Sequence, residues 1–144
     1  MEINNVLNEL LVNLFKDIND LEERAIQTGE YKSVTTNDMH VIDAIGMGQA
    51  KNMSSVAKIL DVTMGTLTIS VNSLVKKGFV QRVRSEEDRR VVLISLTDSG
   101  KKAYEHHRQF HQNMISSATK ELTGEEKAVL EKVLTKLNAF LKQI

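Results

Sequence analysis

The chain has 144 residues, with 19 Lys and Arg balanced by 19 Asp and Glu, and it contains neither cysteine nor proline. That length fits one domain, or one subunit of an oligomer whose core a partner completes. The absence of cysteine excludes disulfides, thiolate metal sites and cysteine nucleophiles. The N-terminal segment has no basic leader and no run of about 18 apolar residues, so we expect a cytoplasmic protein without a membrane span.

The balanced charge hides an uneven distribution. Residues 1–34 carry three Lys and Arg against seven Asp and Glu, whereas residues 63–97 carry six basic side chains against three acidic ones. Concentrated positive charge is what binding to phosphates requires. The centre of the chain is therefore the part in which a nucleic-acid contact is expected.

Both ends of the chain have a helical apolar pattern. From Leu7 to Ala25 apolar residues recur at alternating steps of four and three, and the same rhythm returns from Leu130 to Ile144. Thr123 begins a capping box for the last of these helices. Such stripes favour packing against another helix. We expect the two terminal helices to build a homodimer interface, and packing within a single chain is the alternative.

The middle of the chain predicts a helix-turn-helix. Thr35 is expected to cap a helix that continues to about Met47, and a short helix is expected near residues 54–60. Thr63 can cap the next helix, which Gly78 ends. The inward positions of that helix follow a helical period and are Leu67, Val71, Leu74 and Val75. Two helices joined by a short turn form this motif.

Two short strands follow. Residues 79–84 and 91–96 are rich in β-branched and apolar side chains, and a charged loop at 85–90 separates them. A long helix is expected from about 97 to 121. The predicted fold is therefore mainly α with a small β-hairpin wing (α+β), in one domain. Residues 35–100 form its winged helix-turn-helix lobe, and 1–34 and 101–144 are its dimerisation segments.

The helix that begins at Thr63 and the wing carry the candidate DNA contacts. The outer face of the helix predicts contacts with DNA bases, since amides and hydroxyls can hydrogen-bond to bases and an apolar group can touch the thymine methyl. An ordinary solvated face is the alternative. The side chains on that face are Thr66, Thr68, Ile69, Asn72, Ser73 and Lys76.

The tip of the wing predicts a minor-groove contact. Asp88 and Arg90 are two residues apart, so the carboxylate can hold the guanidinium extended toward a narrow groove. Phosphate contacts are predicted for Lys76, Lys77, Arg82, Arg84 and Arg89. For Arg82 and Arg84 a structural ion pair with Glu86 or Glu87 is the alternative.

Three stretches together resemble the MarR family: G-T-L-T-x-x-V-x-x-L-x-x-K-G-F-V at 65–80, D-R-R at 88–90 and L-T-x-x-G at 96–100. The resemblance implies a homodimer built from the first and last helices, with two winged lobes on a palindromic operator. It also implies that Asp88 and Arg90 are the wing-tip pair and that Thr66, Thr68 and Ile69 face the groove. Many members have arginine where Ile69 stands, so the base preference there is open.

Within that family the chain is most similar to the fatty-acid-synthesis repressors of the FabT type. The likeness lies in the residues at 39–46, in Val83 to Glu86 and in the pair Phe110 and His111. It implies a long-chain acyl group on acyl carrier protein as co-repressor.

The histidines offer a competing ligand. His107 and His111 are one helical turn apart, and His40, with Glu22 or Glu23, could join them in a zinc site. Hydrogen bonding within the core is the alternative interpretation, and neither a metal nor another cofactor is expected. An enzyme is not expected either, because the chain has no Gly-rich phosphate loop and no recognisable nucleophile with its base. A winged helix used only for protein contact is a remaining rival.

Overall fold

The computed structural model describes residues 2–28, 31 and 33–144. In chain order its elements are α1 (Ile3–Thr28), α2 (Thr36–Ile45), β1 (Lys51–Asn52), α3 (Met53–Leu60), α4 (Met64–Lys77), β2 (Val80–Arg84), β3 (Val92–Leu96), α5 (Asp98–Ala118) and α6 (Gly124–Leu141). The fold class predicted from the sequence is confirmed: the chain is mainly α with a β wing. The chain forms two compact units, Met1–Arg108 and Gln109–Ile144, and the boundary falls within α5.

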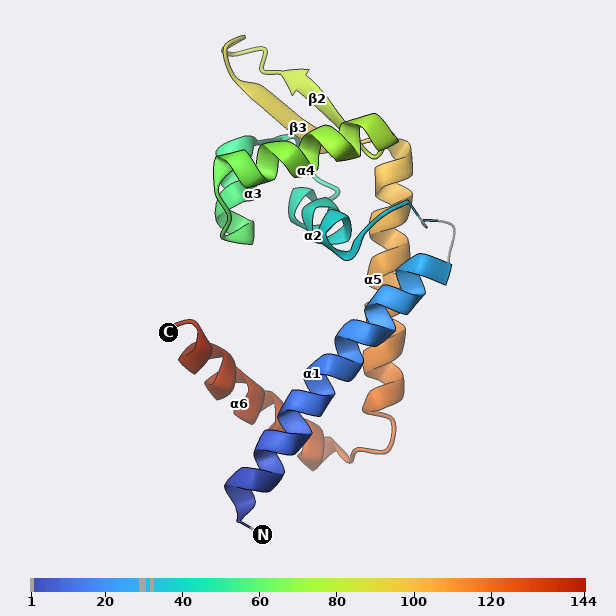
Figure 1. Cartoon of the computed structure of the whole chain (residues 1–144), viewed down its shortest axis with the longest axis vertical. Helices are drawn as coiled ribbons and strands as arrows, with labels where there is room; N and C mark the ends of the chain where they lie inside the picture. Colours follow the sequence, from blue (N-terminus) through green and yellow to red (C-terminus); the bar gives the residue numbers. More distant parts are fainter. Residues whose placement is uncertain (1, 29–30, 32) are drawn as a thin grey trace. The chain divides into compact units, whose positions relative to one another are not determined.

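The first unit contains the helix-turn-helix and the wing. Figure 1 shows α2, α3 and α4 gathered beside the hairpin of β2 and β3. Its core consists of apolar side chains from all of these elements, among them Ile42, Val56, Leu67, Leu74 and Ile94. Leu67, Val71 and Leu74 are buried as predicted, and Val75 packs against the same core. The outer face of α4 is thereby left to solvent.

The sheet has one strand more than the sequence predicted. β3 lies in its centre, paired antiparallel with β2 on one side and with β1 on the other. Lys51 of β1 lies opposite Ile94, and Asn52 lies opposite Leu93. Two residues are too few for an alternating pattern, so β1 had no signal in the sequence.

Local signals place the helix ends well. Thr35, Thr63 and Thr123 each cap a helix, and the boxes at Thr35 and Thr123 are complete. Gly78 ends α4 with a left-handed φ of 87°. Two predicted ends were wrong. The helix expected to reach Met47 stops at Ile45, because Gly46 turns the chain with a φ of 72°, and α5 ends at Ala118 rather than near 121.

Gly100 lies where the start of α5 meets the base of the wing. A Cβ atom at this position would lie 2.0 Å from the carbonyl oxygen of Phe79 and 3.2 Å from Cβ of Leu96. No side chain can be accommodated there unless the backbone moves. This close approach explains the glycine of the L-T-x-x-G stretch and connects α5 tightly to the wing.

The terminal helices keep much of their apolar surface in water. On α1, Leu7, Leu10 and Leu14 are exposed, and α6 has no buried residue. Ile144 of the predicted stripe lies beyond the end of α6. Among the described residues, no helix has the length and apolar character that crossing a membrane requires.

Candidate DNA-binding surface and histidine cluster

Capping interactions fix where α3 begins and ends and where α4 begins. Asn52 accepts a hydrogen bond from the backbone N–H of Ser55 at 2.7 Å, which begins α3, and Asp61 ends it with a left-handed φ of 55°. Thr63 then begins α4 by accepting from the N–H of Thr66 at 3.2 Å. The turn between the helices is therefore only a few residues long, as a helix-turn-helix requires.

The outer face of α4 carries the residues predicted to contact bases. Thr66, Thr68, Ile69 and Asn72 are exposed, as is Lys76, while Ser73 is half-buried. Ile69 is 73% exposed, which is costly for an apolar side chain unless a partner covers it. The hydroxyl of Thr68 donates to the carbonyl of Met64 at 2.7 Å, so it is already engaged within α4. This face has the size and mixed polarity that a major groove accepts.

Asn72 and Arg82 form a contact that the sequence did not indicate. A guanidinium nitrogen of Arg82, on β2, donates to the amide oxygen of Asn72, on α4. The oxygen that would accept from adenine is therefore engaged. The pair links the recognition helix to the wing on the exposed surface.

The other predicted phosphate contacts differ in their surroundings. Arg84 donates to the backbone carbonyl of Arg89 at 2.8 Å, which ties the wing loop together. Lys77 donates to the carboxylate of Asp38 at 2.8 Å and to the carbonyl of Ser33 at 2.6 Å. Arg82 and Arg84 thus have observed partners other than Glu86 and Glu87. Asp38 was not predicted as a partner from the sequence, although its place three residues after Thr35, in a capping box, was a usable signal.

The predicted fork at the wing tip is confirmed. Nε of Arg90 lies 3.1 Å from one carboxylate oxygen of Asp88, and a terminal nitrogen lies 3.1 Å from the other. The side-chain hydrogen bond from Arg90 lowers the pKa of the Asp88 carboxyl below its ordinary value, and the hydrogen bond from the Arg90 backbone lowers it further. The Arg90 side chain is 91% exposed, so a held guanidinium is presented to solvent.

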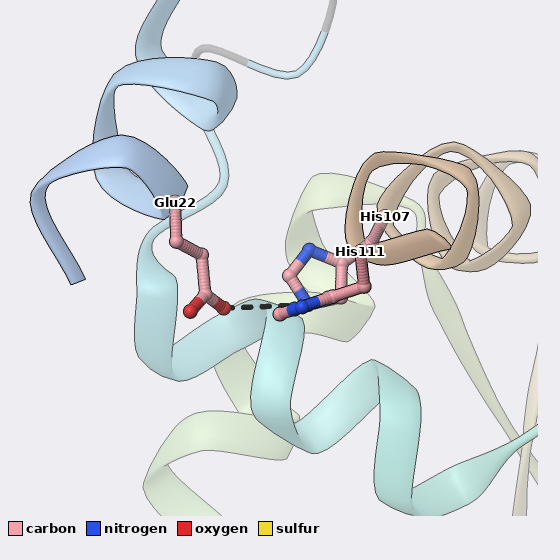
Figure 2. A group of neighbouring side chains, drawn as sticks. All are labelled: Glu22, His107 and His111. Carbon is pink, nitrogen blue, oxygen red and sulfur yellow. Dashed lines mark ion pairs between the residues drawn. The ribbon is translucent and has the colours of Figure 1, made fainter. Parts of the chain in front are cut away.

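A second cluster joins three helices of the first unit through Glu22. This residue of α1 is only 6% exposed. Its Oε1 atom lies 3.3 Å from Nε2 of His107 on α5 and 3.5 Å from Nε2 of His40 on α2. Figure 2 shows the ion pair between Glu22 and His107, with His111 one helical turn further along α5. A single buried carboxylate therefore connects α1 to both neighbouring helices.

Known proteins share this architecture. A family model described as "Transcriptional regulator SarA/Rot" matches residues 27–107. The multiple antibiotic resistance protein MarR of Escherichia coli is 32% identical over 124 residues, covering 83% of this chain and 85% of that protein. The chain is a MarR-family transcriptional regulator. Its relatives are named as regulators, which agrees with the expectation of a non-catalytic protein.

Solved structures of MarR-family proteins cover almost the whole chain. FabT of Streptococcus pneumoniae, in complex with DNA, has a TM-score of 0.92 and 38% identity, covering 97% of this chain and 98% of that one. Apo MarR from Escherichia coli has a TM-score of 0.68 and 29% identity, covering 95% and 97%. The MarR-family protein described here is thus a DNA-binding regulator, and the basic helix and wing are its candidate contact surface.

Proposed function

We propose that this MarR-family regulator is a repressor that binds a palindromic operator as a homodimer. It would control genes of fatty-acid synthesis, with a long-chain acyl-acyl carrier protein as co-repressor. The observation that carries the proposal is the likeness to Streptococcus pneumoniae FabT, at 38% identity over 97% of the chain. The stretches at 39–46 and 83–86 support the same subgroup.

The homodimer is supported by the apolar faces of the terminal helices. Rows of large apolar side chains in water mark surfaces that a partner covers. A second copy of the chain would bury the exposed residues of α1 and α6, with 1–34 and 101–144 as the dimerisation segments. Two lobes related by a two-fold axis would then meet half-sites about 10 base pairs apart. The residues in question are Leu7, Leu10, Leu14, Leu130, Leu134, Leu137 and Leu141.

Within each lobe we assign the contacts by exposure and existing partners. Thr66, Thr68 and Ile69 face the bases of the major groove, and Arg90, held by Asp88, enters the minor groove. Lys76, Arg89 and the pair of Arg82 with Asn72 meet phosphates, which set position more than sequence.

The co-repressor would act as a population shift. The two lobes of the dimer would exchange between arrangements, one of which fits the two half-sites of the operator. A ligand that binds all arrangements equally does not change their populations, so the acylated carrier protein must bind most tightly to the arrangement that fits the operator. The contacts of Glu22 with His40 and His107 support a path by which a change at α1 reaches the lobe, because they connect α1 directly to α2 and α5.

An anisotropy assay tests the proposal. A labelled duplex, selected by the protein from a random pool, is titrated with the regulator in the presence of acylated or unacylated carrier protein. We expect long-chain acylation to tighten binding by about 5- to 150-fold, the usual size of allosteric coupling. The unacylated carrier protein is the matched control. Equal effects of both forms would refute the co-repressor and leave DNA binding itself untouched.

Zinc is a second candidate effector, favoured by the spacing at Glu22. Zinc bonds of about 2.0 to 2.1 Å at the tetrahedral angle place two ligand atoms roughly 3.3 Å apart. The distance from Glu22 Oε1 to His107 Nε2 is 3.3 Å. His111, one turn after His107, has the sequence spacing of a further ligand. Repeating the assay with zinc and with a chelator distinguishes the two effectors, since a response to zinc alone would overturn the acyl proposal.

A further inference from the structure

The start of α2 contains a buried carboxylate that needs a cation. Asp38 is 4% exposed, and its Oδ2 atom accepts from the N–H of Thr35 at 3.0 Å. The same atom accepts from Nζ of Lys77 at 2.8 Å. A charge at this depth is tolerated only with a paired, hydrogen-bonded partner. Lys77 supplies that partner from a position 39 residues away in the sequence.

Two contacts within the first unit hold the side chain of Lys77. Besides Asp38, its ammonium donates to the backbone carbonyl of Ser33 at 2.6 Å. Lys77 lies in the last turn of α4 and is exposed as a whole residue, as Lys76 is, but its side chain is only 29% exposed. A lysine in that turn also interacts favourably with the carboxyl end of the helix dipole. The ammonium is therefore already engaged at the joint between α4 and the start of α2.

A second polar contact joins the same two helices. The amide of Asn37 donates to the hydroxyl of Ser70 at 3.1 Å. Asn37 and Asp38 are adjacent on α2, whereas Ser70 and Lys77 are seven residues apart, which is two turns on one side of α4. The buried leucines between the helices attract without direction. The two polar contacts are directional, so together they set the rotation and the slide of α4 on α2.

We propose that Lys77 is a positioning residue, not a phosphate contact, and that its pair with Asp38 fixes the recognition helix to the start of α2. If the start of α2, or Ser33 just before it, is displaced, α4 moves with it. A lysine that left Asp38 for a phosphate would leave a buried charge uncompensated. The neighbouring Lys76, which is exposed, remains available for the phosphate backbone.

The adjacent lysines allow a matched test. Affinity for the duplex selected from a random pool is measured over a range of salt concentrations for Lys76→Met and Lys77→Met. Loss of one phosphate contact reduces the magnitude of the slope of log K against log salt by about 0.9, so for Lys76→Met, which removes one contact from each protomer of a dimer, we expect a reduction of roughly twice that. For Lys77→Met we expect an unchanged slope and affinity reduced roughly tenfold, as for a lost contact within a network.

Asp38→Asn completes a double-mutant cycle and guards against poor folding of Lys77→Met. Asparagine keeps the acceptor for Thr35 but removes the buried charge. We expect the double variant, Lys77→Met with Asp38→Asn, to recover the melting temperature, because no unpaired buried charge remains, but to bind as weakly as Lys77→Met, because the pair that positions α4 is still absent. Asp38→Asn alone should weaken binding without changing the salt slope, whereas a lysine that contacted phosphate would keep its contribution to binding in that variant. A slope that falls as in Lys76→Met, or effects of the two substitutions that simply add, would overturn the proposal.

Discussion

Gly100→Ala tests how tightly α5 is joined to the base of the wing. The new Cβ atom would lie 2.0 Å from the carbonyl oxygen of Phe79 and 3.1 Å from its carbonyl carbon. A carbon atom approaches a carbonyl oxygen to about 3.3 Å at closest, so a gap of roughly 1.3 Å must open. The oxygen cannot simply turn away, because it accepts a hydrogen bond from the N–H of Thr97 at 3.0 Å.

The expected change in the free energy of unfolding is the balance of two opposing effects. Alanine favours a helix over glycine by about 1 kcal/mol. Forcing a methyl group into occupied space costs about 1 to 3 kcal/mol and more where only backbone can move, as at Gly100. We expect Gly100→Ala to lower the free energy of unfolding by about 2 to 3 kcal/mol. For a chain of this size that corresponds to a fall in Tm of roughly 4 to 12 °C.

Urea denaturation followed by circular dichroism measures the effect, with all variants at one protomer concentration because association adds apparent stability. Gly124→Ala is the matched control. Gly124 is the first residue of α6, and an added Cβ there meets nothing within 4 Å. We expect that control to be neutral or stabilised by up to about 1 kcal/mol. If Gly100→Ala is as stable as Gly124→Ala, the Phe79 carbonyl does not restrict the side chain at position 100.

Three further outcomes are expected. For each protomer, Arg90→Ala should weaken operator binding by about 1 to 3 kcal/mol and reduce the magnitude of the salt slope by about one, whereas an unchanged salt titration would exclude a groove contact. In an NMR titration the pKa of the Asp88 carboxyl should lie below its ordinary value of 3.8. Because this pKa is lowered, the pairing of Asp88 with Arg90 is fully present above pH 3.8 and is lost as the pH falls through the lowered pKa. Arg90→Ala should return the pKa of Asp88 toward 3.8. Leu14→Glu places a charge on the exposed apolar face of α1 and should give monomers by light scattering, and a dimer that persists would contradict the proposed interface.

Sequence patterns predicted the elements that depend on near neighbours. A cap such as Thr63 needs only the N–H of a residue three positions later, and Gly78 adopts its left-handed conformation without tertiary help. The pairing of Asp88 with Arg90 spans two residues. These features are local in the chain, so the order of residues contains the information needed to predict them.

The basic residues whose predicted contacts had to be revised have partners far away in the sequence. Lys77 and Arg82 looked alike as basic residues near a recognition helix, yet one contacts Asp38 and the other contacts Asn72. A charge pattern states that a cation is present but not what it contacts. The strand β1 escaped prediction for a similar reason, since its two residues are ordered by pairing with β3.

By itself the sequence determined the capped starts of α2, α4 and α6, the apolar faces and the basic wing, because helical period, capping and charge are properties of neighbouring residues. Only the tertiary structure decided which cations are already engaged and which buried carboxylates tie the helices together. Asp38 lies under Lys77, and Glu22 lies between His40 and His107. Burial makes such charges depend on partners that only the folded chain brings within reach.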